Sequence, residues 1–115
     1  MFRHIEATRH GAVDVVTVLE TRLIDDPHLD DLRAEIGKIV GDRRGAKLLL
    51  DLGSVEFLSS ATLEMLSTFY RALHASGGQL RLCRVTPPIA EVFRTTKLDR
   101  LFPIHADVEE AMAHF

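Results

Sequence analysis

The apolar residues of this chain follow strand and helix periods in alternation. Weak alternation over residues 4–9 and the β-branched run Val13–Leu19 predict two strands, and Gly11 with Ala12 predicts the turn of a hairpin. The unbroken run Leu48–Leu50 predicts a strand over 47–52 that is covered on both faces, as in a parallel sheet. Two further extended segments are expected, at 79–83 and at 102–104.

Helical periods fill the gaps between these strands. After Pro27 an apolar stripe predicts a helix that ends at Gly41. A second helix is expected to begin at Ser59 and Ser60 and to end at 76–78, and Val55, Phe57 and Leu58 before it are expected in the core. Its predicted inward face consists of Leu63, Leu66, Phe69, Tyr70 and Leu73. Two more helices are expected, one opened by 86–88 and one over 108–115 with Asp107 as its N-cap.

This order predicts an α/β fold with a mixed, mostly parallel sheet, an N-terminal β-hairpin and about four helices. With 115 residues, of which 46% are hydrophobic, the chain is long enough for one core, so we expect a single domain over 1–115. A net charge of -3 argues against a nucleic-acid partner. The absence of a long apolar run argues against a membrane partner and predicts a cytoplasmic protein. The lone Cys83 predicts a buried, inert thiol.

The candidate chemistry lies at the connection from the strand at 47–52 to the second helix. Ser59 and Ser60 stand at a helix N-terminus, where free amides and the helix dipole stabilise a negative group such as phosphate. The alternative is that one serine caps the helix and the other is only small and polar. The six histidines match no zinc-binding spacing, so neither a metal nor a cofactor is predicted. Because the glycines of G-x-S-x-G are missing, a hydrolase that uses Ser60 is the weakest reading and no catalytic residue is predicted.

Three stretches, 48–60, 77–83 and 92–102, together resemble STAS domains, and specifically bacterial anti-sigma factor antagonists. The resemblance covers nearly the whole chain. It implies a small α/β domain that binds an anti-sigma factor, which is itself a serine kinase, and thereby frees a sigma factor to direct transcription. It further implies that phosphorylation of one serine at the start of the second helix switches this binding off.

The family pattern Asp-Ser-Ser-Gly falls on Ser59, Ser60, Ala61 and Thr62. Carried over by position, the phosphorylation site is Ser60, with Ser59 as the alternative. The partner-binding residues that the resemblance implies are Asp25, Ser59, Ser60, Thr62 and Glu64. Asp25 competes with its neighbour Asp26 for this role, and either could be a plain helix cap. The altered pattern keeps a second hypothesis open, an unswitched STAS scaffold or sensor module in a larger signalling assembly, and the oligomeric state stays unspecified.

Overall fold

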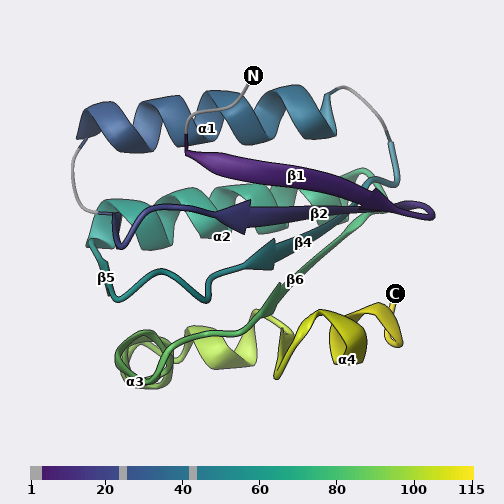
Figure 1. Cartoon of the computed structure of the whole chain (residues 1–115). Helices are drawn as coiled ribbons and strands as arrows, with labels where there is room; N and C mark the ends of the chain where they lie inside the picture. The colour runs from purple at the N-terminus through teal and green to yellow at the C-terminus, as the bar shows by residue number, and fades with distance from the viewer. Residues whose placement is uncertain (1–3, 24–25, 42–43) are drawn as a thin grey trace.

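The computed structural model describes residues 4–23, 26–41 and 44–115, with side chains omitted at 26–28. Within these residues the strands are β1 (Ile5–His10), β2 (Val13–Val18), β3 (Arg22–Leu23), β4 (Lys47–Asp51), β5 (Phe57–Leu58), β6 (Gln79–Cys83) and β7 (Ile104–His105). The helices are α1 (Asp26–Val40), α2 (Ser60–Ala75), α3 (Pro87–Thr95), the 3-10 turn η1 (Leu98–Arg100) and α4 (Val108–Met112). The α1 and α2 helices cover one face of the main sheet, and α3 and α4 lie below it (Figure 1).

The main sheet has the strand order β1-β2-β4-β6-β7. The β1–β2 hairpin is antiparallel, and every other neighbouring pair in this sheet is parallel. The predicted mixed, mostly parallel sheet with an N-terminal hairpin is therefore confirmed, and β4 is its central strand. Because parallel strands end at the same edge of a sheet, the chain leaves β2, β4 and β6 on one side of the molecule. That side carries the start of α2.

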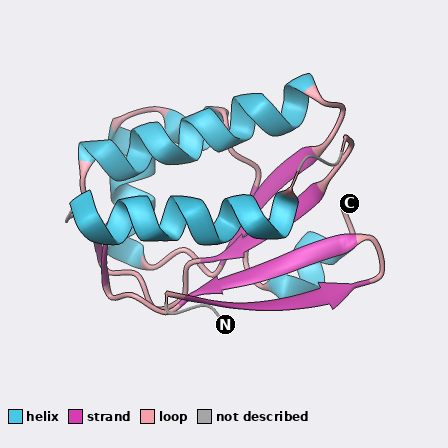
Figure 2. Ribbon diagram, turned by 90° about the horizontal axis from the view of Figure 1, so that it is seen from above, coloured by secondary structure: helices cyan, strands magenta, loops and turns pink. Residues whose placement is uncertain are grey.

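The leucines of β4 divide the core into two parts. Leu48 and Leu50 face the large cluster beneath α1 and α2, the two helices that run side by side in Figure 2. Leu49 faces the smaller cluster on the other side, where Ala111 of α4 covers the sheet. All three leucines have no exposed surface. Full burial of one such side chain is worth about 1.5–3 kcal/mol, so this strand contributes strongly to stability on both faces.

The edge strands differ from the centre. In β1 only Ile5 is buried, and the other five residues are exposed. Among the described residues β1 pairs with β2 alone, so it forms an edge of the main sheet. At the opposite edge β7 is only two residues long.

Several predicted details are wrong. The C-terminal helix ends at Met112 instead of residue 115, and Phe115 instead lies with its ring centroid 5.4 Å from the Arg81 guanidinium carbon. The last strand is Ile104–His105, because Phe102 turns into the core and packs against Phe93 and Tyr70.

The predicted inward face of α2 packs on the core, although its residues are buried to different degrees. Leu66 and Leu73 are buried, whereas Phe69 is only partly buried because it lines a hollow between the C-terminal ends of α1 and α2. Phe57, which was expected in the core, has 51% of its surface exposed. The predicted end of α1 is confirmed, since Gly41 takes a left-handed φ of 59° directly after Val40.

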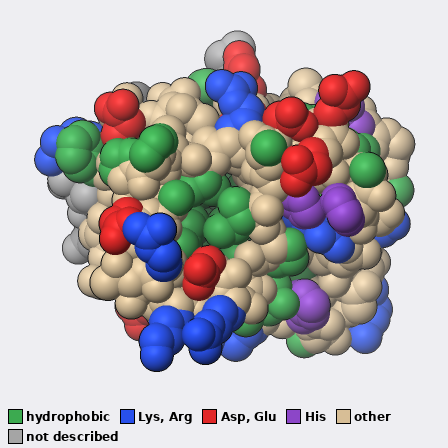
Figure 3. Space-filling view, turned by 90° about the horizontal axis from the view of Figure 1, so that it is seen from below, with side chains coloured by type: hydrophobic (Ala, Val, Ile, Leu, Met, Phe, Trp, Pro, Cys, Tyr) green, Lys and Arg blue, Asp and Glu red, His purple; other side chains and the backbone are tan. Residues whose placement is uncertain are grey.

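Hydrophobic side chains also gather near the middle of the face formed by α3 and α4, with charged side chains around them (Figure 3). Histidines lie to one side of this hydrophobic region. In the part of the chain that the structure describes, no helix is both long enough and apolar enough to cross a membrane.

Candidate functional site

The start of α2 has the predicted capped geometry. Ser59 is the N-cap, with extended backbone angles (φ -103°, ψ 171°), and its Oγ accepts a hydrogen bond from the Thr62 amide at 3.3 Å. Helix α2 then begins at Ser60. Residues 59–62 are called the elbow below. Because the cap uses the Ser59 hydroxyl, the two serines have different roles.

Ser60 is the serine that remains available. It is exposed, and its hydroxyl makes no hydrogen bond to any described residue. The backbone N–H groups of Ser60 and Ala61 also lack hydrogen bonds to described residues, and the first turn of α2 contains no acidic side chain. A free hydroxyl thus stands beside free amides at the positive end of the helix dipole. A phosphate on Ser60 would find stabilising groups in place.

Thr62 lies inside the molecule. It has no exposed surface, and its hydroxyl donates a hydrogen bond to the carbonyl oxygen of Leu23. The same oxygen accepts from the Ser59 amide at 3.1 Å. The Thr62 side chain is therefore not on the surface of the free chain, and its part in partner binding stays a prediction. As the third residue of the helix it points toward β3, and its hydrogen bond to Leu23 fixes the elbow on the inner side.

A second sheet, which the sequence analysis did not anticipate, supports the elbow. Strands β3 and β5 are parallel, with Arg22 opposite Phe57 and Leu23 opposite Leu58. The carbonyl of Thr21 accepts from the amides of Glu56 and Phe57 at 2.8 and 3.2 Å. The segment before α1 therefore fixes the segment before α2.

The connection from β4 to β5 is also held at both ends. The carboxylate of Asp51 accepts from the Gly53 amide at 2.9 Å, as the predicted turn requires, and lies 3.5 Å from the Arg84 guanidinium. Further on, the Thr86 hydroxyl donates to the Val55 carbonyl at 2.6 Å. The elbow is thus tied to the loops that follow β2 and β6.

An exposed aromatic ring lies just before the elbow. The guanidinium carbon of Arg22 is 4.9 Å from the centroid of the Phe57 ring, a cation–π arrangement. Glu56 is exposed, and Glu64 is exposed one helical turn beyond Ser60 on the same face of α2. We call Arg22, Phe57, Ser60 and Glu64 the elbow surface. Aromatic and arginine side chains dominate binding energy at many protein interfaces.

Sequence reasoning missed Arg22 and Phe57 as members of this surface. Strands of two residues carry no readable period, and Phe57 has the same parity as the buried Val55. The one signal was the position of Phe57 directly before the two serines. Asp25 lies outside the described residues, as does the side chain of Asp26, so their part in binding stays a prediction.

Among the residues that the structure describes, groups suited to catalysis or metal binding are not assembled around the elbow. Within the described residues, no group of three histidine, cysteine or acidic side chains could hold a metal ion. No described histidine or carboxylate is hydrogen-bonded to Ser60. Cys83 is fully buried, as expected, and burial, with help from Asp51, raises the pKa of its thiol to about 12. Such a thiol stays protonated and unreactive near neutral pH.

Residues 4–111 match the family model described as the STAS domain. The chain is 30% identical over 93 residues to a protein of Bordetella bronchiseptica named as a candidate anti-sigma factor antagonist, BtrV, covering 81% of this chain and 79% of that protein. A STAS-domain anti-sigma-factor antagonist from Planctomyces limnophilus is 25% identical, with a TM-score of 0.84 and coverage of 96% and 95% of the two chains. An anti-sigma factor antagonist from Mycobacterium paratuberculosis is 29% identical, with a TM-score of 0.81 and coverage of 96% and 91%.

Proposed function

Because this chain belongs to the STAS domain family, we propose that it is an anti-sigma factor antagonist whose binding is switched off when Ser60 is phosphorylated. The partner is an anti-sigma factor with serine kinase activity. Capture of that partner frees a sigma factor, so the protein works in the cytoplasm and controls transcription. The names of relatives at 25–30% identity support the antagonist role. The observation that carries the switch is the exposed hydroxyl of Ser60 at the N-terminus of α2, which does not serve as the helix cap.

In the unmodified protein the elbow surface offers a partner a neutral hydroxyl beside an aromatic anchor. Phe57 supplies apolar area, and Arg22 keeps that ring in place. Glu64 adds a negative charge one turn along α2. A partner that fits this surface has an apolar pocket for the ring and a cation opposite Glu64. Association would then remove Ser60 from water at low cost, because a neutral hydroxyl is far less strongly hydrated than a phosphate.

Phosphorylation changes the complex more than it changes the fold. A phosphate adds about -1.5 to -2 charges at neutral pH, and the free amides of Ser60 and Ala61 accommodate them in the isolated chain. In the complex the same charge loses its water and lies between Glu56 and Glu64. Repulsion and desolvation both oppose binding there. The switch therefore acts on affinity while leaving the free protein folded.

A mass-spectrometric phosphorylation assay tests this proposal. The chain is incubated with Mg-ATP and each anti-sigma serine kinase of its own genome, and the intact mass is recorded. We expect one added phosphate on the wild type and none on Ser60→Ala. Ser59→Asn is the matched control, because asparagine keeps an N-cap acceptor without a hydroxyl, so this variant should still gain one phosphate. A phosphate that persists on Ser60→Ala, or no phosphate with any kinase, rejects the switch.

The altered family pattern supports a second candidate function. Thr62 stands where the family has glycine. The hydrogen bond from its hydroxyl to the Leu23 carbonyl stabilises the conformation of the elbow. An elbow of fixed conformation that binds one partner permanently suits a STAS scaffold or sensor module in a larger assembly. Binding of the anti-sigma partner with equal affinity to the wild type and Ser60→Asp would favour this candidate over the switch.

A further inference from the structure

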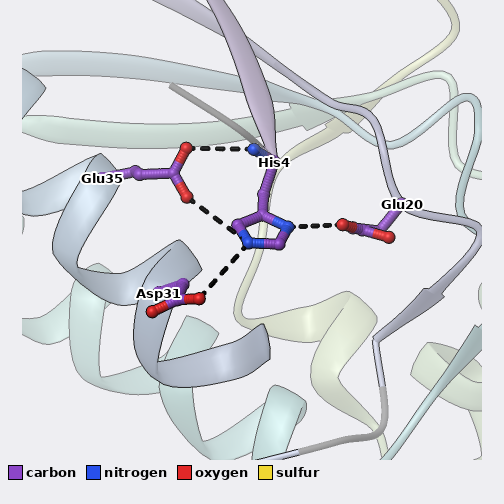
Figure 4. A network of polar contacts seen from close by, with 4 residues as sticks. All are labelled: His4, Glu20, Asp31 and Glu35. Atoms are coloured by element: carbon purple, nitrogen blue, oxygen red, sulfur yellow. Dashed lines mark hydrogen bonds and ion pairs between the residues drawn. The ribbon is translucent and has the colours of Figure 1, made fainter. Parts of the chain in front are cut away.

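The ring of His4 lies in a cage of three carboxylates (Figure 4). Its Nδ1 donates to the Glu20 carboxylate, and its Nε2 is 3.5 Å from an Asp31 oxygen and 3.9 Å from a Glu35 oxygen. The backbone amide of His4 also donates to Glu35 at 3.0 Å. His4 is buried, with 7% of its surface exposed. We call His4, Glu20, Asp31 and Glu35 the His4 cage.

The cage joins three segments that are distant in sequence. His4 directly precedes β1, Glu20 lies in the connection between β2 and β3, and Asp31 and Glu35 lie one turn apart on α1. Both ring nitrogens face carboxylates, and an imidazole ring donates from both nitrogens only when it is protonated. The charged ring is therefore attracted to all three carboxylates, whereas a neutral ring can donate to only one of them. The Glu20 hydrogen bond raises the pKa of His4 against the opposing effect of burial, and the charges of Glu35 and Glu20 and the contact with Asp31 raise it further.

A proton suits this cage better than a metal ion does. Nε2 of the protonated ring carries one hydrogen, which can point toward the Asp31 oxygen at 3.5 Å or the Glu35 oxygen at 3.9 Å, and both carboxylates attract its positive charge. Glu35 already accepts from the His4 backbone amide. Within the described ranges, no set of three or more potential ligands is placed to bind a metal ion.

Glu20 is the first residue of the segment 20–23, which is hydrogen-bonded to the elbow and to the residues before it. The next residue, Thr21, accepts hydrogen bonds through its carbonyl from the amides of Glu56 and Phe57. Two residues further, the Leu23 carbonyl accepts from the Ser59 amide and the Thr62 hydroxyl. The backbone of residues 20–23 thus joins the hydrogen bond of Glu20 to the His4 ring with the hydrogen bonds of Thr21 and Leu23 to the chain at the N-terminus of α2.

We propose that protonated His4 is a positioning residue that anchors residues 20–23 through Glu20 and so sets how firmly the elbow is held. The proton on His4 keeps Glu20 in place, and the carbonyls of Thr21 and Leu23 then hold the chain before α2. When the proton leaves, Glu20 faces a neutral ring near two other carboxylates, and residues 20–23 loosen. This inference concerns the free chain and does not depend on the proposed partner.

The direction of the pH effect follows from the raised pKa of His4. The folded chain holds this proton more tightly than the unfolded chain, whose histidine has the ordinary value of about 6.5. The stabilisation that protonated His4 gives to the His4 cage is therefore fully present below pH 6.5. It is lost as the pH rises above 6.5 through the folded pKa. The hydrogen bonds that hold the elbow should therefore open rarely on the acid side of this range and more often on the alkaline side.

Hydrogen exchange measured by NMR on the full chain tests the proposal. The pKa of His4 is read from its ring resonances, and the intrinsic exchange rates are divided by the observed rates to give protection factors at each pH. We expect the protection of the Phe57 and Ser59 amides to fall about tenfold through the His4 titration, a size typical of one lost hydrogen bond to a charged group. Core amides such as that of Leu50 should keep their protection.

Two variants separate positioning from general stability. Glu20→Gln keeps an acceptor but removes the charge, so the pKa of His4 should fall and the pH dependence at Phe57 and Ser59 should shrink. His10→Gln changes the exposed histidine that ends β1 and should leave that dependence intact. A His4 pKa at or below 6.5, unchanged protection at Phe57 and Ser59, or an equal fall at Leu50 would each overturn the proposal. The His4 pKa and the protection factors are measured on the wild-type chain, so the test does not require a His4 variant that folds.

Discussion

The hydroxyl of Thr62 donates a hydrogen bond to the carbonyl oxygen of Leu23, 39 positions earlier in the chain. Thr62 has no exposed surface, and Leu23 is 2% exposed, so water does not replace this bond. It joins the segment before α1 to the first turn of α2. The orientation of the two helix starts therefore rests in part on one buried hydroxyl.

Removal of this hydroxyl should destabilise the protein. Thr62→Val keeps the shape of the side chain but leaves the Leu23 carbonyl with the Ser59 amide as its remaining described donor. We expect the free energy of unfolding to fall by about 1–2 kcal/mol, the usual cost of a lost buried hydrogen bond. Urea denaturation followed by circular dichroism measures this change.

Thr68→Val is the matched control for that prediction. Thr68 lies on the same helix, and its hydroxyl donates to the Glu64 carbonyl at 2.9 Å in an exposed position. Water can replace this bond, so we expect a change within about 0.5 kcal/mol. Equal losses for Thr62→Val and Thr68→Val would show that the Leu23 contact contributes nothing of its own.

A negative charge at position 60 should weaken partner binding without unfolding the chain. We expect Ser60→Asp to lower the affinity for the anti-sigma partner by roughly 2 kcal/mol or more, about thirtyfold, because the partner must desolvate the new charge. The melting temperature should barely change, since the helix N-terminus tolerates the charge. Titration calorimetry with parallel thermal melts measures both quantities.

Ser60→Ala serves as the control for the charge effect. It removes a hydroxyl that makes no hydrogen bond to described residues, so it should bind nearly as well as the wild type. Equal affinities for the aspartate, alanine and wild-type proteins would contradict the switch.

Two glycine substitutions should change stability in opposite directions. A Cβ atom at Gly78 would lie 2.2 Å from the backbone oxygen of Ala46, so Gly78→Ala must push strands β4 and β6 apart where they begin. We expect a loss of about 1–3 kcal/mol or more. Gly37 lies within α1 with no atom within 4 Å of such a Cβ, so Gly37→Ala should gain about 0.5–1 kcal/mol. Chemical denaturation of both variants checks the pair, and a stabilised Gly78→Ala protein would refute the close approach.

His105 should make the protein less stable in acid. Burial and the nearby Arg81 guanidinium lower the pKa of His105 below its ordinary value, and Glu110 opposes them. The unfolded chain then binds this proton more readily, so stability falls as the pH drops from 6.5 toward the folded pKa. We expect His105→Gln to flatten this part of the curve of unfolding free energy against pH.

The two buried histidines can be separated in such an experiment. The slope from His4 lies above pH 6.5 because its pKa is raised, whereas the slope from His105 lies below that value. His10→Gln, on an exposed residue, should alter neither slope. An acid slope of equal size in the wild type and His105→Gln would remove His105 as its cause.

The fold was predictable because its main elements have long, clear periods. The Leu48–Leu50 run and the Val13–Leu19 run each match one strand, and caps such as Ser59 and Gly41 mark helix ends. The missed elements are short ones that only tertiary contacts define. Strands β3 and β5 exist because the Thr21 and Leu23 carbonyls meet the chain before α2, and no local pattern encodes that meeting.

The candidate site was predictable in position but not in detail. Local chemistry placed two serines at a helix start, and the structure distinguishes the capping Ser59 from the free Ser60. The inward direction of Thr62 depends on how α2 meets β3, so the residue type alone did not reveal it. The exposure of Phe57 likewise depends on the path of the chain after the turn at 53–54, between β4 and β5.

The outer edge of β1 bears on how copies of this chain behave in concentrated solution. An unpaired strand is a template on which another molecule could add a strand and begin to aggregate. Here five of the six residues in β1 are exposed, and they include Glu6, Arg9 and His10. A second copy that docked along this edge would have to strip water from charged side chains. The polar character of β1 thus opposes misassembly along the long edge that this strand forms in the described part of the main sheet, while the elbow stays accessible.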